Sequence, residues 1–514
     1  MTSPTPLKLF NSLTRQLEPF QPVHANEARV YSCGPTVYNY QHIGNMRAYV
    51  FADTLGRVLR FKGYDLRHII NITDVGHLTS DADAGDDKME QAAAQTGKSA
   101  WDIAAFYTAE FKRDLKWLNV CDPAKWTVAT DYVPAMIDYA RSIADKHCYE
   151  LPSGLYFDVS TVPEYGRLAR AATDAIETLG GEGRIEQIDG KRHQADFAIW
   201  RKTPPGETRQ MEWDSPWGRG APGWHLECSV MSGAELGMPF DIHTGGIDHR
   251  EIHHPNEIAQ NQAHECSAHT GASIWMHNNF LNIRDGKMSK SAGETLRMQH
   301  LVDAGCHPLA FRLLCLQAHY RSELEFSWEG LGAALVRLKR MVMGVQSLKA
   351  RCSKEDLNEI ERLAVEWTSA KLQSLIADQF SPYEPKRGND DTPKHLAFEF
   401  DQTISSDLSL AIGLVNLDEV LALGDVAPSE LLTMVSAFDS VFGLRLIELT
   451  RADLRIRPKA ATITEAEIEA KLAARKLARA ARDFATSDRL RDELAVQGVE
   501  VMDGDLLGWD WKLG

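Results

Sequence analysis

The stretch 29–47, RVYSCGPTVYNYQHIGNMR, constrains the fold of this chain more than any other part of its sequence. Its apolar and aromatic start predicts a strand, a Cys33-Gly34-Pro35 turn ends that strand, and His42 stands where an amphipathic helix opens. Such a junction places a thiol and several backbone N–H groups over a helix N-terminus, where anions bind. The stretch therefore predicts a phosphate site beside a sulfur ligand.

The next segments continue the alternation of strand and helix. An apolar face along residues 46–62 predicts a helix that ends at Gly63, and the run 67–74, RHIINITD, predicts a buried strand. Strand, helix and strand at this spacing indicate a parallel α/β sheet. Because ligands of such sheets lie at the carboxyl ends of the strands, we expect Cys33, Thr73 and Asp74 to line one crevice.

Length and composition limit the classes of protein that fit. A chain of 514 residues is long enough for about three domains. It has no apolar run of membrane-spanning length and no signal-peptide layout, so we expect a cytoplasmic protein. Its eight cysteines are too scattered for a secreted disulfide scaffold, and its net charge of −16 disfavours indiscriminate binding to a polyanion. Any nucleic acid must therefore be bound by local basic faces.

The pattern changes along the chain in a way that predicts several domains. Residues 129–222 are mixed, with a helix near 132–146 and short strands near 155–159 and 196–200, which indicates an insertion between two halves of a sheet domain. A strand near 275–281 belongs to the second half. After Leu301 the pattern is helical, interrupted by the polar segment 381–394.

Two short motifs fall in predicted turns. Gly97-Lys98-Ser99 is similar to the end of a P-loop but lacks its leading glycine, so it is expected to separate two helices. The segment 282–292, NIRDGKMSKSA, places Lys287 and Lys290 in a turn after a strand, where they form either a phosphate-binding loop or a solvated one.

A group of metal-ligand residue types is spread over the first half of the chain. His253 and Glu257 are four residues apart at a predicted helix start, so both face one side. With Cys33 and Cys228 they offer two thiolates, an imidazole and a carboxylate, a set that suits tetrahedral zinc. Other histidines compete as ligands, namely His243, His249, His254 and His264.

Taken together, five segments resemble the cysteinyl-tRNA synthetase family of class I aminoacyl-tRNA synthetases. They are CGPTVYNYQHIGN, NITDVGHLTSDADAGDDK, GWHLECS, HTGGIDH with HHPNEIAQ, and GKMSKS, in the family's order. The resemblance implies an α/β Rossmann-like parallel-sheet catalytic domain split by an insertion, followed by an all-α helical bundle and a small C-terminal domain. The implied bounds are 1–128 and 223–325 for the catalytic halves, 129–222 for the acceptor-end-binding insertion, 326–455 for the bundle and 456–514 for the anticodon-binding domain.

The resemblance also assigns roles to single residues. His42 and Asn45 fall on the first and last positions of the HIGH signature, where Asn45 replaces a histidine; its amide still donates a hydrogen bond to ATP but cannot become cationic. Lys287 and Lys290 are the lysines of an intact KMSKS signature. The remaining implied roles are zinc binding by Cys33, Cys228, His253 and Glu257, substrate or ATP binding by Gly34, Thr73, Trp224, Asp248 and Lys290, and tRNA binding by Arg479, Asp488 and Asp503.

The activity implied is the ATP-dependent joining of L-cysteine to tRNA(Cys) through cysteinyl-adenylate, by a monomer with one Zn²⁺ and with Mg²⁺ accompanying ATP. Two other functions remain open. One is a cysteine ligase of the mycothiol-pathway type, which joins cysteine to an amino sugar and has no need of the helical region after residue 326. The other is a catalytically inactive paralogue that binds tRNA.

Overall fold

Five parallel strands form the central sheet of the protein, in the spatial order β11-β10-β3-β4-β5. They are β3 (Glu27–Ser32), β4 (Asp65–Ile72), β5 (Lys125–Val128), β10 (Phe240–Gly246) and β11 (Ala272–Asn278). On one side of the sheet the strands follow in chain order outward from β3 through β4 to β5, and on the other side they follow outward from β10 to β11. The direction of this order therefore reverses between β3 and β10. The predicted parallel sheet is confirmed, and its crevice for ligands lies at the carboxyl ends of β3 and β10.

The computed structural model describes residues 5–75, 88–169, 188–283, 295–363, 367–372, 374 and 393–513. Within these ranges, no helix has both the length and the hydropathy that crossing a membrane requires. The predicted lysine motif, with Lys287 and Lys290, and the polar segment up to residue 392 lie outside the described residues.

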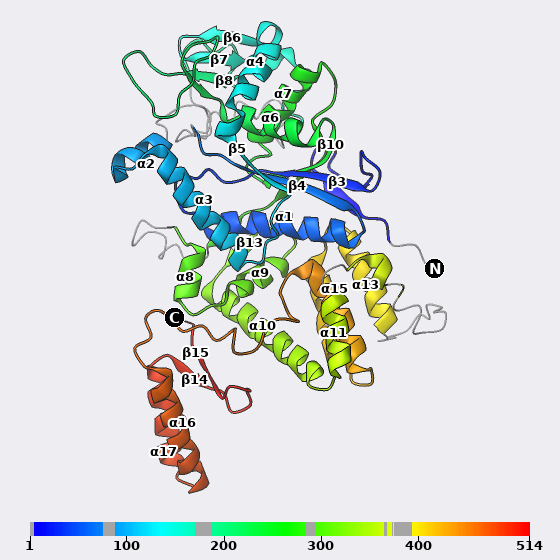
Figure 1. Cartoon of the computed structure of the whole chain (residues 1–514), viewed down its shortest axis with the longest axis vertical. Helices are drawn as coiled ribbons and strands as arrows, with labels where there is room; N and C mark the ends of the chain where they lie inside the picture. The colour runs from blue at the N-terminus through cyan, green and yellow to red at the C-terminus, as the bar shows by residue number, and fades with distance from the viewer. Residues whose placement is uncertain are drawn as a thin grey trace.

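Helices cover both faces of the sheet. In Figure 1, α1 (Ile43–Phe61) lies on one side, and α6 (Trp224–Leu236) and α7 (His253–Glu265) lie on the other. Helix α1 begins three residues earlier than predicted because His42 and Asn45 cap it, and it ends before Gly63, whose φ is +91°. It buries Val50, Leu55 and Leu59, at about 1.5–3 kcal/mol for each such side chain.

The predicted break at Gly97 is confirmed. It lies between α2 (Lys88–Thr96) and α3 (Ala100–Trp117), with a φ of +67°, and the side chain of Ser99 accepts a hydrogen bond from the backbone N of Asp102 as the N-cap of α3. The segment is therefore a helix–turn–helix and not a P-loop.

A second, antiparallel sheet interrupts the first between β5 and α6 (Figure 1). Its order is β6-β7-β8-β9, and α4 (Val133–His147) lies beside it and packs against α6 and α7. The strands are β6 (Cys148–Leu151), β7 (Gly154–Phe157), β8 (Phe197–Lys202) and β9 (Gly220–Pro222), with short 3₁₀ turns at Ala129–Tyr132 and Val159–Thr161. The parallel sheet is thus split by an insertion, as the sequence predicts.

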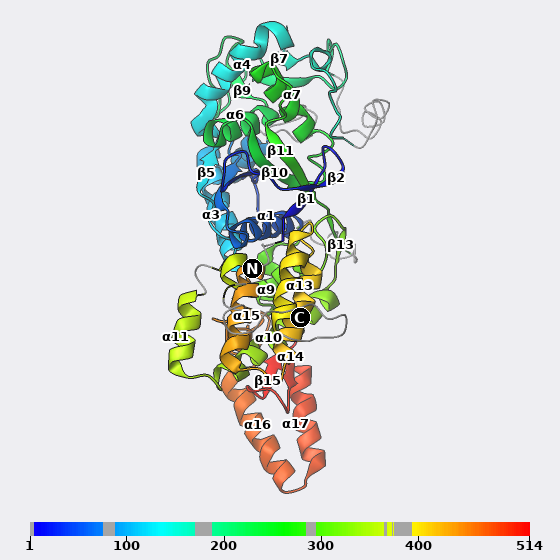
Figure 2. The same ribbon diagram turned by 90° about the vertical axis from the view of Figure 1, so that its right-hand side faces the viewer.

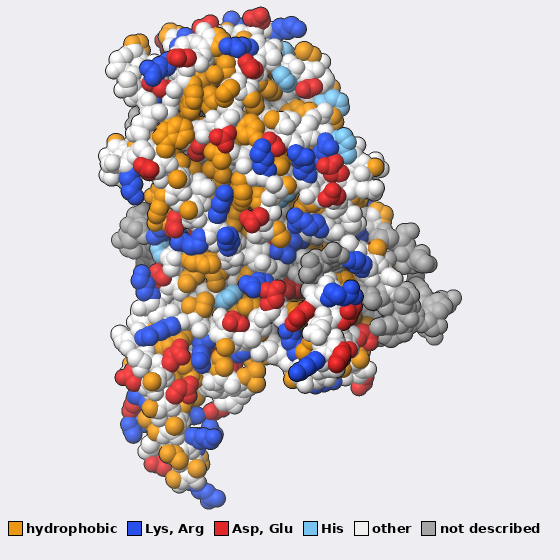
Figure 3. All heavy atoms as spheres, in the orientation of Figure 1, with side chains coloured by type: hydrophobic (Ala, Val, Ile, Leu, Met, Phe, Trp, Pro, Cys, Tyr) orange, Lys and Arg blue, Asp and Glu red, His pale blue; other side chains and the backbone are white. Residues whose placement is uncertain are grey.

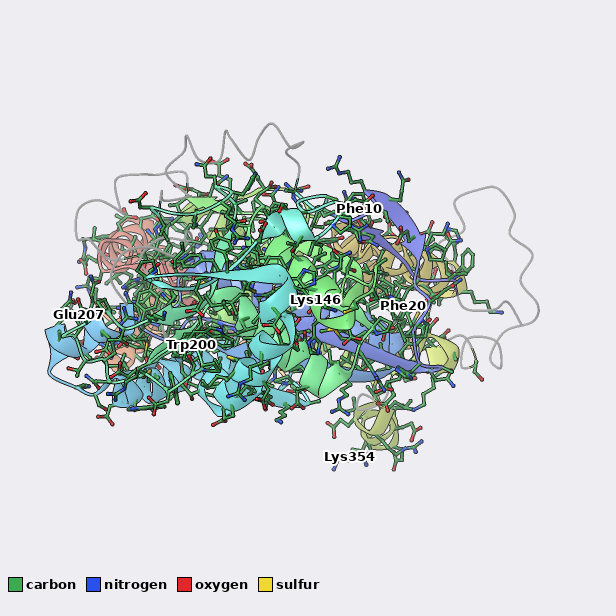
Figure 4. All side chains as sticks on the ribbon, turned by 90° about the horizontal axis from the view of Figure 1, so that it is seen from above. Phe10, Phe20, Lys146, Trp200, Glu207 and Lys354 are labelled. Carbon is green, nitrogen blue, oxygen red and sulfur yellow. The ribbon has the colours of Figure 1, made fainter. Side chains whose placement is uncertain are left out.

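The helical bundle lies on the side of the sheet that α1 covers (Figure 1). It comprises α8 (Met298–Asp303), α9 (Pro308–Leu316), α10 (Trp328–Lys349), α11 (Lys354–Leu363), α13 (Pro393–Ser405), α14 (Leu410–Ala422) and α15 (Pro428–Phe442). Figure 4 shows Lys354, at the start of α11, outside the main body of the molecule. The expectation of helix alone after Leu301 is wrong at β13 (Leu324–Phe326), which pairs in parallel with β12 (Leu281–Ile283). A separate hairpin, β1 (Lys8–Asn11) and β2 (Gln16–Pro19), opens the chain.

The C-terminal unit has a core of its own. Helices α16 (Glu465–Ala480) and α17 (Phe484–Val496) form an antiparallel pair at the far end of the molecule (Figure 2), followed by β14 (Val499–Val501) and β15 (Trp509–Trp511). Trp509 and Trp511 are 0% and 5% exposed and pack with Ile468 and Leu494. Both rings therefore dock the end of the chain onto this unit.

Candidate active site and metal centre

A cavity of about 590 Å³ opens at the carboxyl ends of β3 and β10. It collects predicted site residues from segments that are far apart in the sequence, because the loops after both strands and the starts of α1, α6 and α7 meet there. The predicted residues in its wall are Cys33, Gly34, His42, Asn45, Thr73, Trp224, Cys228, Asp248 and His253. The expected crevice is confirmed for Cys33 and Thr73.

Asp74 is the exception. It is buried, but its carboxylate accepts hydrogen bonds from the backbone N and the hydroxyl of Thr130, at 3.0 and 2.6 Å, and it is not in the cavity wall. The sequence correctly predicted that Asp74 lies at the carboxyl-end edge of the sheet. Its side chain ties the end of β4 to the start of the insertion instead.

Gly34 lets the loop after β3 lie directly on β4. A Cβ at this position would stand 1.6 Å from the carbonyl oxygen of Asn71, and the Gly34 N donates to Oδ1 of Asn71 at 2.6 Å. The Asn71 amide in turn donates to Thr73 Oγ1 at 3.0 Å, and Thr73 donates to the buried Glu227 at 2.9 Å. This chain of hydrogen bonds fixes one wall of the cavity, and Asn71 and Glu227 are contributors that the sequence did not single out.

His42 and Asn45 form the N-terminal cap of α1. The Asn45 backbone N donates to Nδ1 of His42, and the His42 backbone N donates to Oδ1 of Asn45, both at 3.2 Å. Desolvation by the cavity walls lowers the pKa of His42, whereas the charge of Asp248 opposes that change. A neutral imidazole and the positive end of the α1 dipole therefore face the cavity, an arrangement that suits a phosphate.

The four predicted metal ligands converge on one side of the cavity. One donor atom each from Cys33, Cys228, His253 and Glu257 lie within 4.8 Å of one another. With zinc bonds of about 2.0–2.3 Å, the donors of a tetrahedral site lie roughly 3.3–3.8 Å apart, so this spacing fits the ion. Oε1 of Glu257 is buried and, among the described residues, accepts no well-directed hydrogen bond, although His253 Nε2 is 3.0 Å away. The donor set thus fits zinc.

Charge in this cluster also favours a cation. A hydrogen bond from Cys33 is the largest influence on the pKa of Cys228 and lowers it to about 6. Burial raises the pKa of Glu257, but the nearby His243 and His253 outweigh burial and lower it to about 2. A thiolate and a carboxylate are therefore held together out of water, where a bound metal would compensate their charge.

Histidines surround the predicted ligands and orient them. Nδ1 of His225 is 2.9 Å from Nδ1 of His253, which leaves Nε2 of His253 for a metal, and His243 Nε2 is 2.9 Å from Oε2 of Glu257. Nε2 of His254 lies 3.3 Å from Cys33 Sγ, and its Nδ1 lies 2.8 Å from His277. Such contacts to the atoms behind a ligand are typical of metal sites.

Among the competing histidines, His243 and His254 form a second possible donor set with Cys33 and Glu257. His249 lies beside them, with its ring 4.9 Å from that of His253. His264 is elsewhere, stacked on Tyr139 at 4.1 Å. Sequence reasoning missed His225 and His277, although His225 stands inside the GWHLECS segment, three residues before a predicted ligand.

Trp224 and Asp248 lie on the cavity wall on either side of this cluster. The ring of Trp224 packs 4.3 Å from that of His253. Asp248 follows Gly245 and Gly246, the last two residues of β10, and a Cβ on Gly246 would stand 2.3 Å from Oδ1 of Asp248. The glycine therefore allows the carboxylate to fold back over the end of the strand.

The predicted tRNA-binding residues lie at the other end of the molecule, in the C-terminal unit. Asp503 accepts from both Arg475, at 2.7 and 3.0 Å, and Arg479, at 2.9 Å, and these bonds, led by that from Arg475, lower its pKa to about 2. Asp488 pairs with Arg491 at 3.3 Å, and its charge also acts on Arg475. The three predicted residues thus belong to one exposed charged face.

A family model described as the catalytic domain of class I (C) tRNA synthetases matches residues 19–335. The match covers both halves of the sheet and the cavity between them, and it shows that the chain belongs to the class I aminoacyl-tRNA synthetases.

Curated relatives narrow this further. A cysteine–tRNA ligase of Novosphingobium aromaticivorans is 63% identical over 514 residues, covering 99% of this chain and 97% of the relative. Another, of Zymomonas mobilis, is 51% identical and covers 99% and 98% of the two chains. Within its class, the chain is therefore a member of the cysteine–tRNA ligase family. Among solved structures, the putative arginyl-tRNA synthetase of Campylobacter jejuni matches with a TM-score of 0.49 at 16% identity, over 84% of this chain and 94% of the other.

Proposed function

We propose that the protein joins L-cysteine to tRNA(Cys) in two steps, through cysteinyl-adenylate formed from cysteine and ATP. The observation that carries this proposal is that the donor cluster with its two cysteines and the capped start of α1 face the same cavity. One side of the cavity thus suits a thiol, and the other suits a phosphate. Its volume of about 590 Å³ is within the range of pockets that hold a small ligand.

The chain's own part in the reaction is positioning and charge stabilisation. His42, Asn45 and the positive end of the α1 dipole would hold ATP so that the cysteine carboxylate meets the α-phosphate in line. Gly34, Thr73, Trp224 and Asp248 would surround the amino acid. Lys287 and Lys290 of the KMSKS signature would neutralise the negative charge of the departing pyrophosphate, together with Mg²⁺ on ATP.

Specificity for cysteine is assigned to a zinc ion held by Cys33, Cys228, His253 and Glu257. When bound, zinc would act as a Lewis acid that accepts a substrate thiolate and not a serine hydroxyl. The surrounding residues would enforce this choice, because a buried polar site that the wrong substrate leaves unsatisfied rejects that substrate strongly. We therefore propose that the insertion serves to bind the acceptor end of tRNA and not to reject a wrong substrate.

We propose that Arg479, Asp488 and Asp503, in the C-terminal unit well away from the central sheet (Figure 2), contact the anticodon. We also propose that the protein is located in the cytoplasm and is a monomer. Sedimentation or light scattering checks the oligomeric state. No observation favours the amino-sugar ligase or the inactive paralogue, since the cysteine–tRNA ligases match this chain through its C-terminal unit as well.

The decisive measurement is cysteine-dependent ATP–pyrophosphate exchange, with serine as the competing substrate and zinc content determined on the same sample. We expect exchange with cysteine and none with serine. A Cys228→Ser variant should lose both zinc and exchange, because a hydroxyl is a poor ligand for this ion. A folded, zinc-loaded wild-type protein without exchange would refute the proposal, and Cys266→Ser, at an exposed thiol outside the cavity, serves as the control.

A further inference from the structure

An aromatic group lies at the mouth of the cavity, between the loop before α1 and the outer face of α3. Tyr40 lines the cavity, and its ring centroid is 5.1 Å from that of Tyr107 and 6.1 Å from that of Phe106. Phe106 and Tyr107 contact each other edge to face at 5.1 Å. Phe106 is 43% exposed, so part of its ring is open to a ligand at the mouth.

Two cations complete this group. The guanidinium carbon of Arg297 lies 4.0 Å over the ring of Tyr40, and Nζ of Lys98 lies 5.3 Å over the ring of Phe106. Arg297 is fixed close to the cavity because the Ile43 N donates to the carbonyl oxygen of Leu296 at 2.9 Å. The chain as a whole carries a net charge of −16, so these two cations differ in sign from its overall charge.

The same surface is tied to the insertion. The backbone N of Gln210, between β8 and β9, donates to Glu90 of α2 at 2.6 Å, and its side-chain oxygen accepts from the Ala100 N of α3 at 2.8 Å. In Figure 1, α2, α3 and α8 lie along one side of the molecule, and Figure 3 shows hydrophobic and basic side chains reaching the surface over this side. The group therefore adjoins the cavity through Tyr40, and the helix that carries Phe106 is bonded to the insertion.

We propose that Tyr40, Phe106, Lys98 and Arg297 form a stacking platform on which the unpaired 3′-terminal nucleotides of tRNA lie as they enter the cavity. Single-stranded nucleic acids bind where aromatic rings or guanidinium planes stack the bases and cations follow the phosphates, and this group offers both. The inference rests on the proposed function and adds the part of the tRNA that this surface binds.

The test separates adenylate formation from tRNA binding. Phe106→Ala should raise the Kd and KM for tRNA about tenfold and leave cysteine-dependent pyrophosphate exchange, which needs no tRNA, within about twofold of wild type. Phe106→Trp should restore tight binding. Phe398→Ala is the matched control, because Phe398 is 39% exposed but lies in α13 of the bundle. An equal fall in exchange would mean that Phe106 only supports Tyr40, and it would overturn the proposal, as would an unchanged Kd.

A shortened tRNA identifies the nucleotides involved. If the platform binds the unpaired 3′ end, removing those nucleotides should weaken binding to wild type, and Phe106→Ala should then cause no further loss. An equal effect of the variant on intact and shortened tRNA would overturn the assignment. Lys98→Gln should lower the slope of log Kd against log salt by about 0.7, as expected for one phosphate contact with a single strand. Failure of the proposed function would look different, since wild type itself would then lack exchange and charging.

Discussion

The imidazole of His225 lies behind the predicted ligand His253, with the two Nδ1 atoms 2.9 Å apart. This contact selects Nε2 of His253 as the atom that faces Glu257 and the thiols. At the residue scale, the site therefore depends on side chains that need not touch substrate or metal. The predicted ligands could be found from residue type and spacing, whereas their supports could not, because a buried histidine has the same appearance in a sequence whatever it contacts.

Replacing His225 with Phe should weaken zinc binding by about 10–100-fold, because the ring of His253 loses the contact that orients it. Competition with a chromogenic chelator measures the change. His264→Phe is the control, since His264 stacks on Tyr139 away from the cluster. Equal zinc affinity in the His225→Phe variant and the wild type would show that packing alone orients His253.

His68 predicts a pH dependence of stability. Burial lowers the pKa of His68, in β4, to about 4, and Ser32 Oγ lies 2.8 Å from its Nε2. Between pH 6.5 and 4 the unfolded chain binds a proton at this residue that the folded chain does not, so the free energy of unfolding falls as the pH falls, by about 3 kcal/mol in all. Above pH 6.5 the residue has no such effect.

Urea unfolding followed by tryptophan fluorescence across pH 7 to 4 tests this expectation. In His68→Gln the dependence on pH should be shallower than in the wild type by up to one proton. Identical slopes in the two proteins would contradict the assignment to His68.

At the element scale, a buried ion cluster joins α1 to the bundle. Asp53 of α1 accepts from Arg57 at 2.7 Å and from Arg312 of α9 at 2.6 Å, and Nε of Arg312 donates to the carbonyl oxygen of Phe442 at the end of α15 at 2.6 Å. Both arginines lie where a Cβ on Gly443 would stand, at 2.7–2.8 Å from their guanidinium atoms. The helix that carries His42 and Asn45 is thus fixed to helices more than 250 residues further along the chain.

Asp53→Ala should destabilise the protein by about 3–5 kcal/mol, because it leaves two buried guanidinium groups without their carboxylate. Urea titration measures the loss. Asp138→Ala removes the partner of Arg141 in an exposed pair, at side-chain exposures of 73% and 57%, and should change stability by less than about 1 kcal/mol. Similar losses in both variants would show that the buried cluster has no special role.

At the scale of the whole molecule, charged side chains attach the C-terminal unit to the bundle. Arg451, in the segment before that unit, is 1% exposed and donates to Asp505 at 2.8 Å and to Asp510 of β15. Asp510 also accepts from Lys339 of α10. Farther along the segment, Arg455 lies 4.0 Å over the ring of Trp509. Several basic residues of this segment therefore fix the orientation of the unit.

Asp510→Ala should loosen the C-terminal unit, because Lys339 loses its buried partner and Arg451 loses one of the two carboxylates that it contacts. If that unit binds the anticodon as proposed, the KM for tRNA should rise at least about tenfold while pyrophosphate exchange without tRNA stays near wild type. Limited proteolysis should cut faster within residues 451–464. Lys459→Ala, at a 78% exposed side chain, is the control, and unchanged proteolysis of Asp510→Ala would contradict the role given to this contact.

The sequence by itself determined the parallel sheet, the first and last residues of α1 to within three positions, the helical bundle and the residues that converge on the cavity. These follow from periodicity, from glycine and proline at turns, and from the short motifs, all of which act over a few neighbouring residues. Only the tertiary structure decided what depends on contacts across hundreds of residues. In the folded chain Asp74 accepts hydrogen bonds from Thr130, Trp509 and Trp511 are buried in a core, β12 pairs with β13, and histidines lie behind the predicted ligands. These contacts depend on tertiary structure because burial and hydrogen bonding between distant segments are set by the packing of the whole chain.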